Sequence, residues 1–545
     1  MKIFFTNPPL RELHFSRSQR SPGVIKSGTM YYPYWLAHAA ALAESRDHEI
    51  YLLDCPADFI NRDGLLQEIQ DQQPDLIVLD TSTPSINFDL QTVVKIRQIT
   101  DAKILMVGTH VTSEWHHCLE ACAELDFIAM GEYDFSVSEL AEALERNALL
   151  NDIAGLAYRD HSNNGALIQT DVRLPIENMD ELPWIAPIYK RFLTPENYLF
   201  TIASQPMIML IGGRGCKAKC FYCVYPQVMH GHNYRTRSLP HLIGEMKWIE
   251  ENMPEIKEIV FEDDTFTSDR QRAKDFAAMI KSEGIRLPFF ANIRTNVDRE
   301  TLAALKTAGL RECAVGFESG DDLILANMRK GQNVKAQRQF MDNCKDLGIL
   351  VHGCFMVGFP GETKETMAKT LALSMELNPD SAQFYPVMPY PGTSAYQWAK
   401  DNNYLTSENF DDWLDEHGAH QCVLNLPGLS TSELESFCEH AFRKYHFRPR
   451  YIVRKLTQAL TNPKEGLRSI NAGLNFLTSI FTREKDTPKT VHLLPKDEHW
   501  REKSKVPYGR MEQVENVIKL INVDEIDGNA AKEALRSSEQ LTERS

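Results

Sequence analysis

The feature that most constrains the fold is a repeated alternation of short apolar runs with stretches of helical periodicity. Five such runs, rich in aliphatic, β-branched or aromatic residues, lie at 2–7, 49–55, 75–81, 102–108 and 126–132. Nearly continuous apolar runs are typical of strands that are buried on both faces of a parallel sheet. We therefore predict an α/β fold that begins with a five-stranded, doubly wound domain of the Rossmann-like (flavodoxin-like) kind.

Loops rich in Pro, Ser, Thr or Gly follow these runs. In an open parallel sheet, ligands bind beyond the carboxyl ends of the strands, where such loops lie. The predicted ligand-binding rim consists of the loops at residues 7–9, 55–58, 81–85, 108–110 and 131–134.

The alternation resumes in the middle of the chain. Six further strand candidates lie at 207–213, 257–263, 288–293, 312–319, 350–358 and 381–388, with amphipathic segments between most of them. Six βα units in series predict a (β/α)6 partial TIM barrel, whose active site would lie at the carboxyl ends of its strands.

The intervening segment and the last part of the chain have different patterns. Residues 155–160 and 166–175 suggest a small hairpin, and prolines at 183 and 187 mark a domain boundary. Ser432 and Glu435 have the spacing of a helix capping box. We assign residues 1–150 to the Rossmann-like domain, 151–200 to a connector, 201–400 to the barrel, 401–485 to a helical C-terminal region and 486–545 to an extension that is partly disordered.

Composition excludes several classes of function. A formal net charge of −16 argues against nucleic acid as a partner, because such binding relies on cationic surfaces. No apolar run approaches the ~20 residues of a membrane span, so we expect a cytoplasmic protein without an integral span. The eleven cysteines, an odd number without a secretory signal, predict reduced thiols rather than a disulfide framework.

Three of these cysteines form the segment IGGRGCKAKCFYCVYP, directly after the first strand of the second series. Cys216, Cys220 and Cys223 have C-x3-C-x2-C spacing, which brings three thiolates within reach of one metal centre. Thiolates are the ligands of iron–sulfur clusters, and three of them leave one iron of a [4Fe-4S] cluster open. Two alternatives remain: a zinc site completed by His230 or His232, and three buried cysteines without a metal.

With Tyr222 just before its last cysteine, this motif resembles the signature of the radical S-adenosylmethionine (SAM) superfamily. The resemblance implies that the open iron binds SAM through its amino and carboxylate groups. An electron from the cluster then cleaves the sulfonium to give a 5′-deoxyadenosyl radical. It also places Tyr222 on the adenine side of SAM and implies an external electron donor such as flavodoxin or ferredoxin.

Other strand ends resemble the SAM-contacting motifs of that superfamily. The resemblance assigns the acidic motif after the second strand to the SAM amino group, a position after the fourth strand to SAM, and a glycine-containing motif after the fifth to adenine and ribose. The corresponding residues are Glu262, Asp263, Asp264, Glu318, Gly358, Pro360 and Gly361. The alternatives are a solvated acidic turn and an ordinary strand-to-helix turn in which Glu362 and Thr363 begin a helix.

Two further groups of polar residues are candidates for ligand contacts. Asn292 and Arg294 follow the third strand and could meet the SAM carboxylate or the substrate. A basic patch just after the cysteine motif could hold an anionic group, or could be a solvated loop. It consists of His230, His232, Arg235 and Arg237.

A doubly wound domain before such a barrel resembles the cobalamin-binding class of radical SAM enzymes. The tentative cobalamin contacts are Thr81, Ser82, Gly108, His110 and Gly131. The D-x-H-x-x-G motif, which supplies an axial histidine in many corrinoid proteins, is absent from the sequence. Cobalamin would therefore bind without an imidazole from that motif, and the alternative is a degenerate Rossmann-like domain that contacts substrate or a partner.

Within that class, segments such as YYPYWLAHAAAL, DTSTPSINFD and PIYKRFLTPENY resemble the radical SAM proteins associated with hopanoid biosynthesis. This branch implies rearrangement of a biosynthetic intermediate, with a small molecule or a lipid head group derived from a sugar as substrate. The alternatives are a cobalamin-dependent radical SAM C-methyltransferase and a non-enzymatic iron–sulfur or zinc protein. No catalytic residue is assigned from the sequence.

Overall fold

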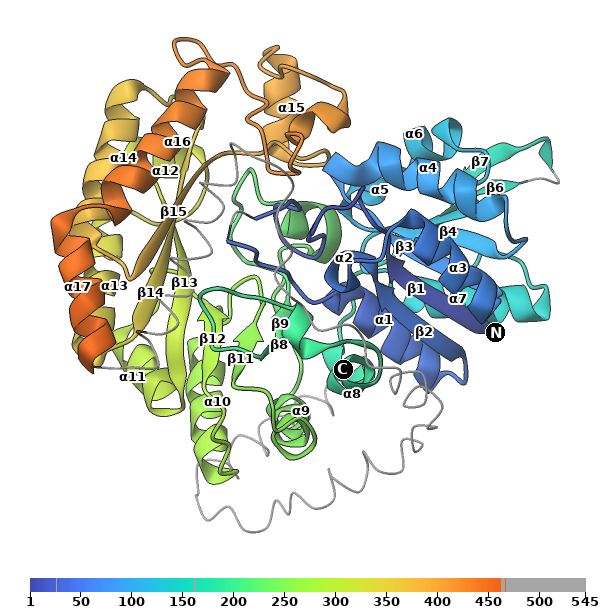
Figure 1. Cartoon of the computed structure of the whole chain (residues 1–545), viewed down its shortest axis with the longest axis horizontal. Coiled ribbons are helices and arrows are strands. Elements are labelled where there is room, and N and C mark those ends of the chain that lie inside the picture. Colours follow the sequence, from blue (N-terminus) through green and yellow to red (C-terminus); the bar gives the residue numbers. More distant parts are fainter. Residues whose placement is uncertain (26, 161–162, 462–465, 467–545) are drawn as a thin grey trace, which may run out of the picture. The chain divides into compact units, whose positions relative to one another are not determined.

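The computed structural model describes residues 1–25, 27–160, 163–461 and 466, which form two parallel sheets with their helices (Figure 1). The predicted extension at 486–545, and most of the predicted helical region beyond residue 461, lie outside the described residues. In the described part of the chain, no helix is long and apolar enough to cross a membrane.

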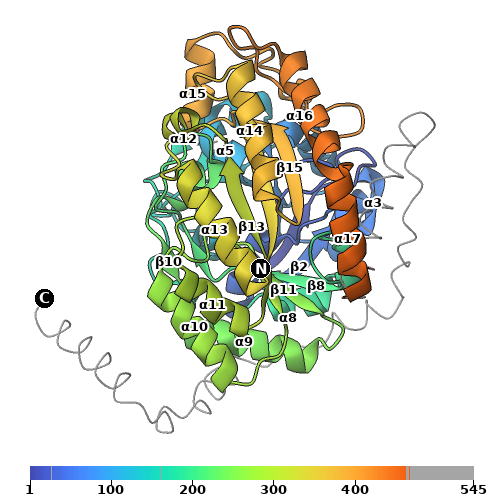
Figure 2. The ribbon, with the colours of Figure 1, turned by 90° about the vertical axis from the view of Figure 1, so that its left-hand side faces the viewer.

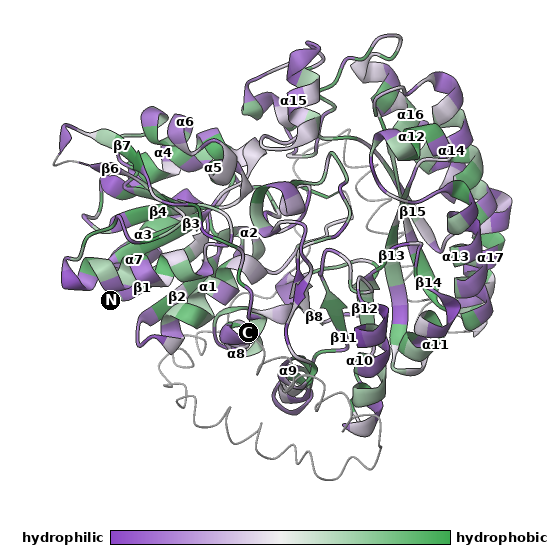
Figure 3. Ribbon diagram, turned by 180° about the vertical axis from the view of Figure 1, so that it is seen from behind, coloured by the Kyte–Doolittle hydropathy of each residue, from purple (hydrophilic) through white to green (hydrophobic). Residues whose placement is uncertain are grey.

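The first sheet contains the five predicted parallel strands in the order β2-β1-β3-β4-β5, as in flavodoxin-like folds. Figure 3 shows strands of both sheets coloured largely as hydrophobic, in agreement with burial on both faces. The strands are β1 (Lys2–Asn7), β2 (Glu49–Asp54), β3 (Leu76–Asp80), β4 (Lys103–Val107) and β5 (Phe127–Ala129). The helices of this part are α1 (Tyr34–Ser45), α2 (Cys55–Asp58), α3 (Arg62–Gln72), α4 (Ile86–Arg97), α5 (Thr109–Ser113), α6 (Trp115–Ala121) and α7 (Asp134–Arg146).

The predicted hairpin is present, but it extends the first sheet instead of standing apart from it. Strands β6 (Leu156–Asp160) and β7 (Ala166–Gln169) are antiparallel, and β6 pairs with β5. The hairpin thereby satisfies the backbone groups of β5, which would otherwise be an open edge. Helix α8 (Ala186–Phe192) then leads toward the second sheet.

The second sheet confirms the predicted partial barrel. Its six strands are all parallel and follow the chain in the order β8-β11-β12-β13-β14-β15. They are β8 (Met207–Leu210), β11 (Glu258–Phe261), β12 (Phe289–Asn292), β13 (Leu310–Glu318), β14 (Leu350–Val357) and β15 (Ser381–Pro386). All six carboxyl ends therefore lie at one edge of the sheet.

Crossover helices cover the outer side of this sheet and lie side by side in Figure 2. They are α9 (Leu239–Asn252), α10 (Arg270–Ser282), α11 (Arg299–Thr307), α12 (Asp322–Asn327), α13 (Val334–Leu347) and α14 (Lys364–Leu377). A short ribbon, β9 (Gly213–Arg214) with β10 (Arg235–Thr236), and the helical turn η5 (Tyr225–His230) flank the cysteine motif.

The C-terminal region is helical, as predicted, with α15 (Ser394–Asp401), α16 (Thr431–His446) and α17 (Pro449–Thr461). The predicted capping box is wrong by two residues, because Ser430 and Glu433 form it at the start of α16. Glu435 instead accepts a hydrogen bond from the backbone N–H of Cys422 at 2.8 Å. Two overlapping S-x-x-E pairs occur there, and spacing alone does not distinguish them.

Buried ion pairs join the first sheet to the segment around the cysteine motif. Arg214 forms two hydrogen bonds with Asp134, at 2.6 and 3.0 Å. Glu132 accepts two more from Arg235, at 2.7 and 2.8 Å, and lies 3.0 Å from Nδ1 of His230. Burial alone would raise the pKa of Glu132, but the hydrogen bonds from Arg235 and His230 hold it well below its usual value. Buried or largely buried charges thus fix the first sheet to the ribbon and the turn that flank the cysteine motif.

Removing one member of this network should destabilise the protein strongly. We expect Glu132→Ala to lower the free energy of unfolding by about 3–5 kcal/mol, because Arg235 is left as an uncompensated buried charge. Denaturant unfolding at pH 7 measures this loss.

The stabilisation by Glu132 should also depend on pH. Since the pKa of Glu132 is lower in the folded protein than in the unfolded chain, its contribution to the free energy of unfolding is complete above the unfolded-state pKa. This contribution should shrink as the pH falls below that pKa. Glu142→Ala, which breaks a partly exposed pair with Arg46, serves as the control and should cost less than about 1 kcal/mol. Equal losses in the two variants would contradict this account.

Candidate functional site

The cysteine motif forms a loop at the carboxyl edge of the second sheet, held by backbone hydrogen bonds. The N–H of Gly212 donates to Asp263 at 2.6 Å, and the N–H of Gly215 donates to Asp264 at 3.1 Å. From η5, Nε2 of Gln227 lies 3.1, 3.0 and 3.0 Å from the carbonyl oxygens of Cys220, Phe221 and Cys223. The acidic strand end and one glutamine therefore determine the shape of the loop.

Its three thiols are free, and Cys216 and Cys220 are buried. Burial raises the pKa of Cys223, with a further increase from the charge of Asp264. Among the described residues, no three His, Cys, Asp or Glu side chains surround a point where a single metal ion could bind. The motif supplies three thiols, whereas a structural zinc site usually has four ligands. It is compatible with a cluster, in which each cysteine binds a different iron atom.

The three carboxylates at the end of β11 contact two different sets of partners. Asp263 accepts hydrogen bonds from Gly212 and from the hydroxyl of Tyr234, and burial raises its pKa to about 7. Glu262 accepts one from Asn292 at 3.2 Å, and it shares the guanidinium of Arg20 with Asp264 at 3.3 and 3.4 Å. The alternative of a solvated acidic turn is therefore wrong, because all three side chains are at least partly buried and engaged in contacts.

Glu318 occupies a strained position at the end of β13. Its φ of +62° lies in the left-handed region, which non-glycine residues seldom adopt, and the register with β14 shifts there. Its carboxylate accepts hydrogen bonds from Lys330 at 2.5 Å and from the hydroxyl of Tyr222 at 3.0 Å. A side chain at Gly316 would collide with this pair, since a Cβ would lie 2.1 Å from Oε1 of Glu318. The structure thus brings Tyr222 and Glu318 together.

The glycine-containing loop after β14 packs against the cysteine loop. Phe359 contacts the ring of Tyr222 at a centroid distance of 5.4 Å, and the carbonyl of Pro360 accepts a hydrogen bond from Asn327 at 2.7 Å. Gly358 and Gly361 both have positive φ, and Thr363 caps α14 together with Thr366. The loop is therefore the start of a helix, as the ordinary-turn alternative states, and it also lies beside the motif.

The predicted anion-binding basic patch is wrong. Arg235 and His230 are engaged by Glu132, and Arg237 is fully buried with Glu245 at 2.6 Å. His232 lies 3.1 Å from the carbonyl oxygen of Cys216. Arg294, another candidate, donates to the carbonyl of Lys330. The sequence shows that cations cluster here, but it does not show which distant carboxylates pair with them in the fold.

At the rim of the first sheet, Thr81, Ser82 and Gly108 line a small cleft. Gly108 has a φ of +121°, and a Cβ there would lie 2.2 Å from the carbonyl oxygen of Thr81, so the two loops can meet only through glycine. Further lining residues are Arg17, Gln19, Trp35, Asp80, Thr109, Tyr133, Tyr225 and Met229.

Two other candidates at this rim lie outside the cleft lining. His110 is buried, with Nδ1 3.2 Å from the hydroxyl of Thr83 and its ring against Phe410, and burial lowers its pKa to about 3. Gly131 donates to the hydroxyl of Thr112.

The cleft has features that a polar cofactor would satisfy. The hydroxyl of Tyr133 and Nε of Arg17 are buried and have no hydrogen-bond partner within the described part of the chain. Unpaired buried polar atoms are costly unless a ligand or water satisfies them. An amide of the kind that a corrin ring carries at its edge could pair with these two atoms.

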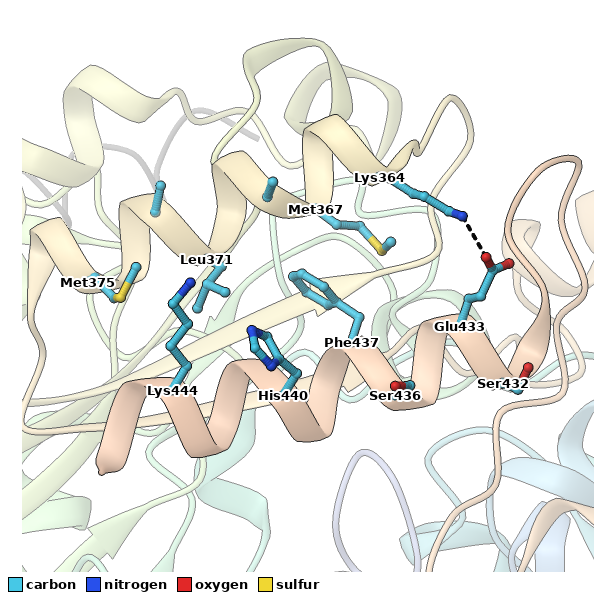
Figure 4. A pocket seen from close by; sticks show the side chains of 12 residues that line it. Lys364, Met367, Leu371, Met375, Ser432, Glu433, Ser436, Phe437, His440 and Lys444 are labelled. Atoms are coloured by element: carbon cyan, nitrogen blue, oxygen red, sulfur yellow. Dashed lines mark ion pairs between the residues drawn. The ribbon is translucent and has the colours of Figure 1, made fainter. Parts of the chain in front are cut away.

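A larger groove lies elsewhere, between α14 and α16 (Figure 4). Met367, Leu371 and Phe437 form its apolar floor, and the ion pair of Lys364 with Glu433 lies at one end. The predicted site residues do not line it.

Sequence reasoning missed several residues of the site. Arg20, Gln227 and Lys330 contact candidate residues, yet they lie outside any recognised motif. Lys330 is 12 residues from Glu318 in the sequence, and Gln227 is 7 residues from Cys220. Arg20 is 242 residues from Glu262, so no local spacing could identify it.

The conformation of the cysteine loop depends on Gly215, which has a φ of +88° and whose Cβ would lie 2.1 Å from the carbonyl oxygen of Asn233. Gly284 has a φ of +69° and open space around it. We expect Gly284→Ala to cost about 1–2 kcal/mol, the usual penalty for a left-handed residue, and Gly215→Ala to cost clearly more. Thermal and denaturant unfolding measure the difference. Equal losses of stability in the two variants would mean that the cysteine loop can move to accommodate a side chain at position 215.

Two known protein families match this chain, one in the region of each large sheet. Residues 210–374 match the Radical SAM superfamily, and residues 20–141 match the B12 binding domain. The first range contains the cysteine loop and the strand ends described above, and the second contains the rim cleft's loops at Thr81 and Gly108.

Relatives cover most of the chain. An uncharacterized methyltransferase of Pyrococcus horikoshii is 29% identical over 432 residues, which are 79% of this chain and 91% of that protein. The anaerobic magnesium-protoporphyrin IX monomethyl ester cyclase of Cereibacter sphaeroides is 24% identical over 411 residues, covering 74% of this chain and 64% of the cyclase. Cytidylyl-2-hydroxyethylphosphonate methyltransferase of Streptomyces wedmorensis is 22% identical over 457 residues, with coverages of 74% and 83%.

Among solved structures, the radical SAM methyltransferase TsrM of Kitasatospora setae, with cobalamin and a [4Fe-4S] cluster bound, has the same fold. Its TM-score is 0.66 at 16% identity, covering 89% of this chain and 100% of TsrM. The chain is a radical SAM enzyme with a B12-binding domain, and its cofactors are a [4Fe-4S] cluster, SAM and cobalamin.

Proposed function

We propose that this enzyme is a cobalamin-dependent methyltransferase acting on a small molecule. One observation carries the proposal: η5, which directly follows the cysteine motif, also supplies Tyr225 and Met229 to the rim cleft of the B12-binding domain. The two predicted cofactor sites thus share a wall. Methyl transfer needs such proximity, because a carbon radical formed near one cofactor must meet a methyl group carried by the other.

In this proposal Cys216, Cys220 and Cys223 hold the cluster, which supplies the electron that cleaves SAM. The loop shaped by Asp263, Asp264 and Gln227 keeps the three thiols on one side of the motif. Tyr222 and Phe359 form an aromatic wall that excludes water from the adenine side.

The remaining SAM contacts are assigned from the geometry of the strand ends. Glu262 and Asp264 offer carboxylate oxygens to the SAM ammonium group, and the ion pair with Lys330 orients the carboxylate of Glu318. Gly358, Pro360 and Gly361 allow close backbone approach to adenine and ribose. Thr81, Ser82 and Gly108 would contact the corrin, which supplies the methyl carrier.

The relatives favour methyl transfer over the rearrangement suggested by the sequence, since two of the three named above are methyltransferases. Rearrangement or ring closure is the second candidate, supported by the cyclase relative and by the hopanoid-like sequence segments. Those segments make a sugar-derived head group a candidate acceptor. A flavodoxin or ferredoxin would be the electron donor.

Product analysis separates the candidates. The full-length protein is purified anaerobically, reconstituted with iron and sulfide, and incubated with SAM and dithionite, with and without hydroxocobalamin. We expect 5′-deoxyadenosine in both reactions and S-adenosylhomocysteine only with hydroxocobalamin, because methyl transfer consumes a second SAM. Formation of 5′-deoxyadenosine alone would favour rearrangement. Iron binding without either product would favour a non-enzymatic iron–sulfur protein.

Cysteine substitutions test the assignment of the cluster ligands. We expect Cys220→Ala to lose most of the iron and all formation of 5′-deoxyadenosine while the thermal midpoint changes little, because the loop is held by Gln227 and the acidic strand end. Cys438→Ala, which alters a buried cysteine on α16, is the control and should retain full iron content. Full iron content and SAM cleavage in Cys220→Ala would refute the assignment.

A further inference from the structure

Arg20 comes from the B12-binding half of the chain and reaches the acidic strand end of the radical SAM sheet. Its guanidinium lies 3.3 Å from Glu262 and 3.4 Å from Asp264, and it donates to the carbonyl of Asp263 at 3.2 Å. This contact spans 242 residues of sequence. A cation from one domain is therefore inserted among the carboxylates of the other.

The loop that carries Arg20 is held firmly on both sides. Arg17 is fully buried and pairs with Asp89 at 2.8 Å. Tyr225 donates its hydroxyl hydrogen to the carbonyl of Ser18 at 3.1 Å, and Gln19 donates to the carbonyl of Gly23 at 3.1 Å. Because its neighbours are fixed, Arg20 is presented to the strand end at little cost in conformational entropy.

The charges of this cluster do not balance. Glu262 and Asp264 have side chains that are 1% and 5% exposed, and when both are ionised they place two negative charges against the one positive charge of Arg20. Buried charges are stable only when they are paired. SAM carries an ammonium, a sulfonium and a carboxylate, a net charge of +1, so its binding would bring this set to neutrality.

The cluster also lies at the cysteine loop. Asp264 accepts a hydrogen bond from Gly215, the residue before Cys216, at 3.1 Å. Arg20 also lies over the ring of Tyr225, two residues after Cys223, at 5.5 Å from its centroid. An amino acid group bound here would lie beside the open side of the cysteine motif.

We infer that Arg20, Glu262 and Asp264 form one site for the α-amino acid group of SAM, in which Arg20 binds the carboxylate while the two acids bind the ammonium. The inference rests on the proposed SAM site at this strand end. In such a site positive and negative groups alternate. When SAM binds, Arg20, Glu262 and Asp264 would exchange their long mutual contacts of 3.3–3.4 Å for contacts to the ligand. The contact to the SAM carboxylate then comes from the B12-binding half of the chain.

The test compares two ligands that differ only in the carboxylate. Equilibrium binding of SAM and of decarboxylated SAM is measured anaerobically on the reconstituted full-length protein, for the wild type, Arg20→Met and Arg20→Lys. We expect Arg20→Met to weaken SAM binding about 10- to 100-fold, as for loss of a hydrogen-bonded charge pair, with an intermediate effect for Arg20→Lys. Binding of decarboxylated SAM should change less than about 3-fold, because the contact that Arg20 makes is missing from this ligand.

Iron content and thermal midpoint of each variant show whether it is folded and loaded. Arg46→Met, which removes a cation beside α1 remote from the site, is the matched control and should bind both ligands like the wild type. If Arg20→Met binds SAM normally, or weakens both ligands equally, the inference is wrong while the proposed function stands. If the wild type, loaded with iron, does not bind SAM at all, the proposed function itself fails.

Discussion

The site depends on two hydrogen bonds from the backbone of the cysteine loop to adjacent carboxylates at the end of β11. Asp263 receives the N–H of Gly212 at 2.6 Å, and Asp264 receives that of Gly215 at 3.1 Å. Neighbouring parallel strands place their carboxyl ends together, so β8 and β11 deliver the loop and the acids to the same place. A loop of unusual backbone conformation is thus fixed by elements of regular structure.

The buried charges between the two halves of the described chain have a comparable role. Glu132 and Asp134 lie at the start of α7, and their partners Arg214, His230 and Arg235 flank the cysteine motif on both sides. Such pairs add little net stability compared with an apolar interface, but they tolerate no displacement without leaving a buried charge unpaired. These pairs therefore fix the position of η5 relative to the loop that precedes α7.

Regular and contiguous features could be predicted from the sequence. The strands of both sheets follow from continuous apolar runs such as those at β3 and β14, and the cysteine loop from its spacing. The partner of each polar side chain could not be predicted in the same way. Arg235 was expected to bind an anion and instead binds Glu132, and His110 at the rim packs against Phe410. Those partners are 103 and 300 residues away, and spacing carries no information about them.

The segment at residues 17–20 contacts two regions of the enzyme that are far apart in the sequence. Arg17 and Gln19 line the rim cleft, and Arg20 contacts the acidic strand end, so adjacent residues reach the regions assigned to the two cofactors. A displacement of this segment at one site would therefore also change its position at the other site. Coupling of this kind is reciprocal, because linked equilibria change each other by the same factor. Besides the ion pairs of Glu132 and Asp134, a short loop without regular structure, held by Asp89 and Tyr225, therefore connects the two halves of the enzyme.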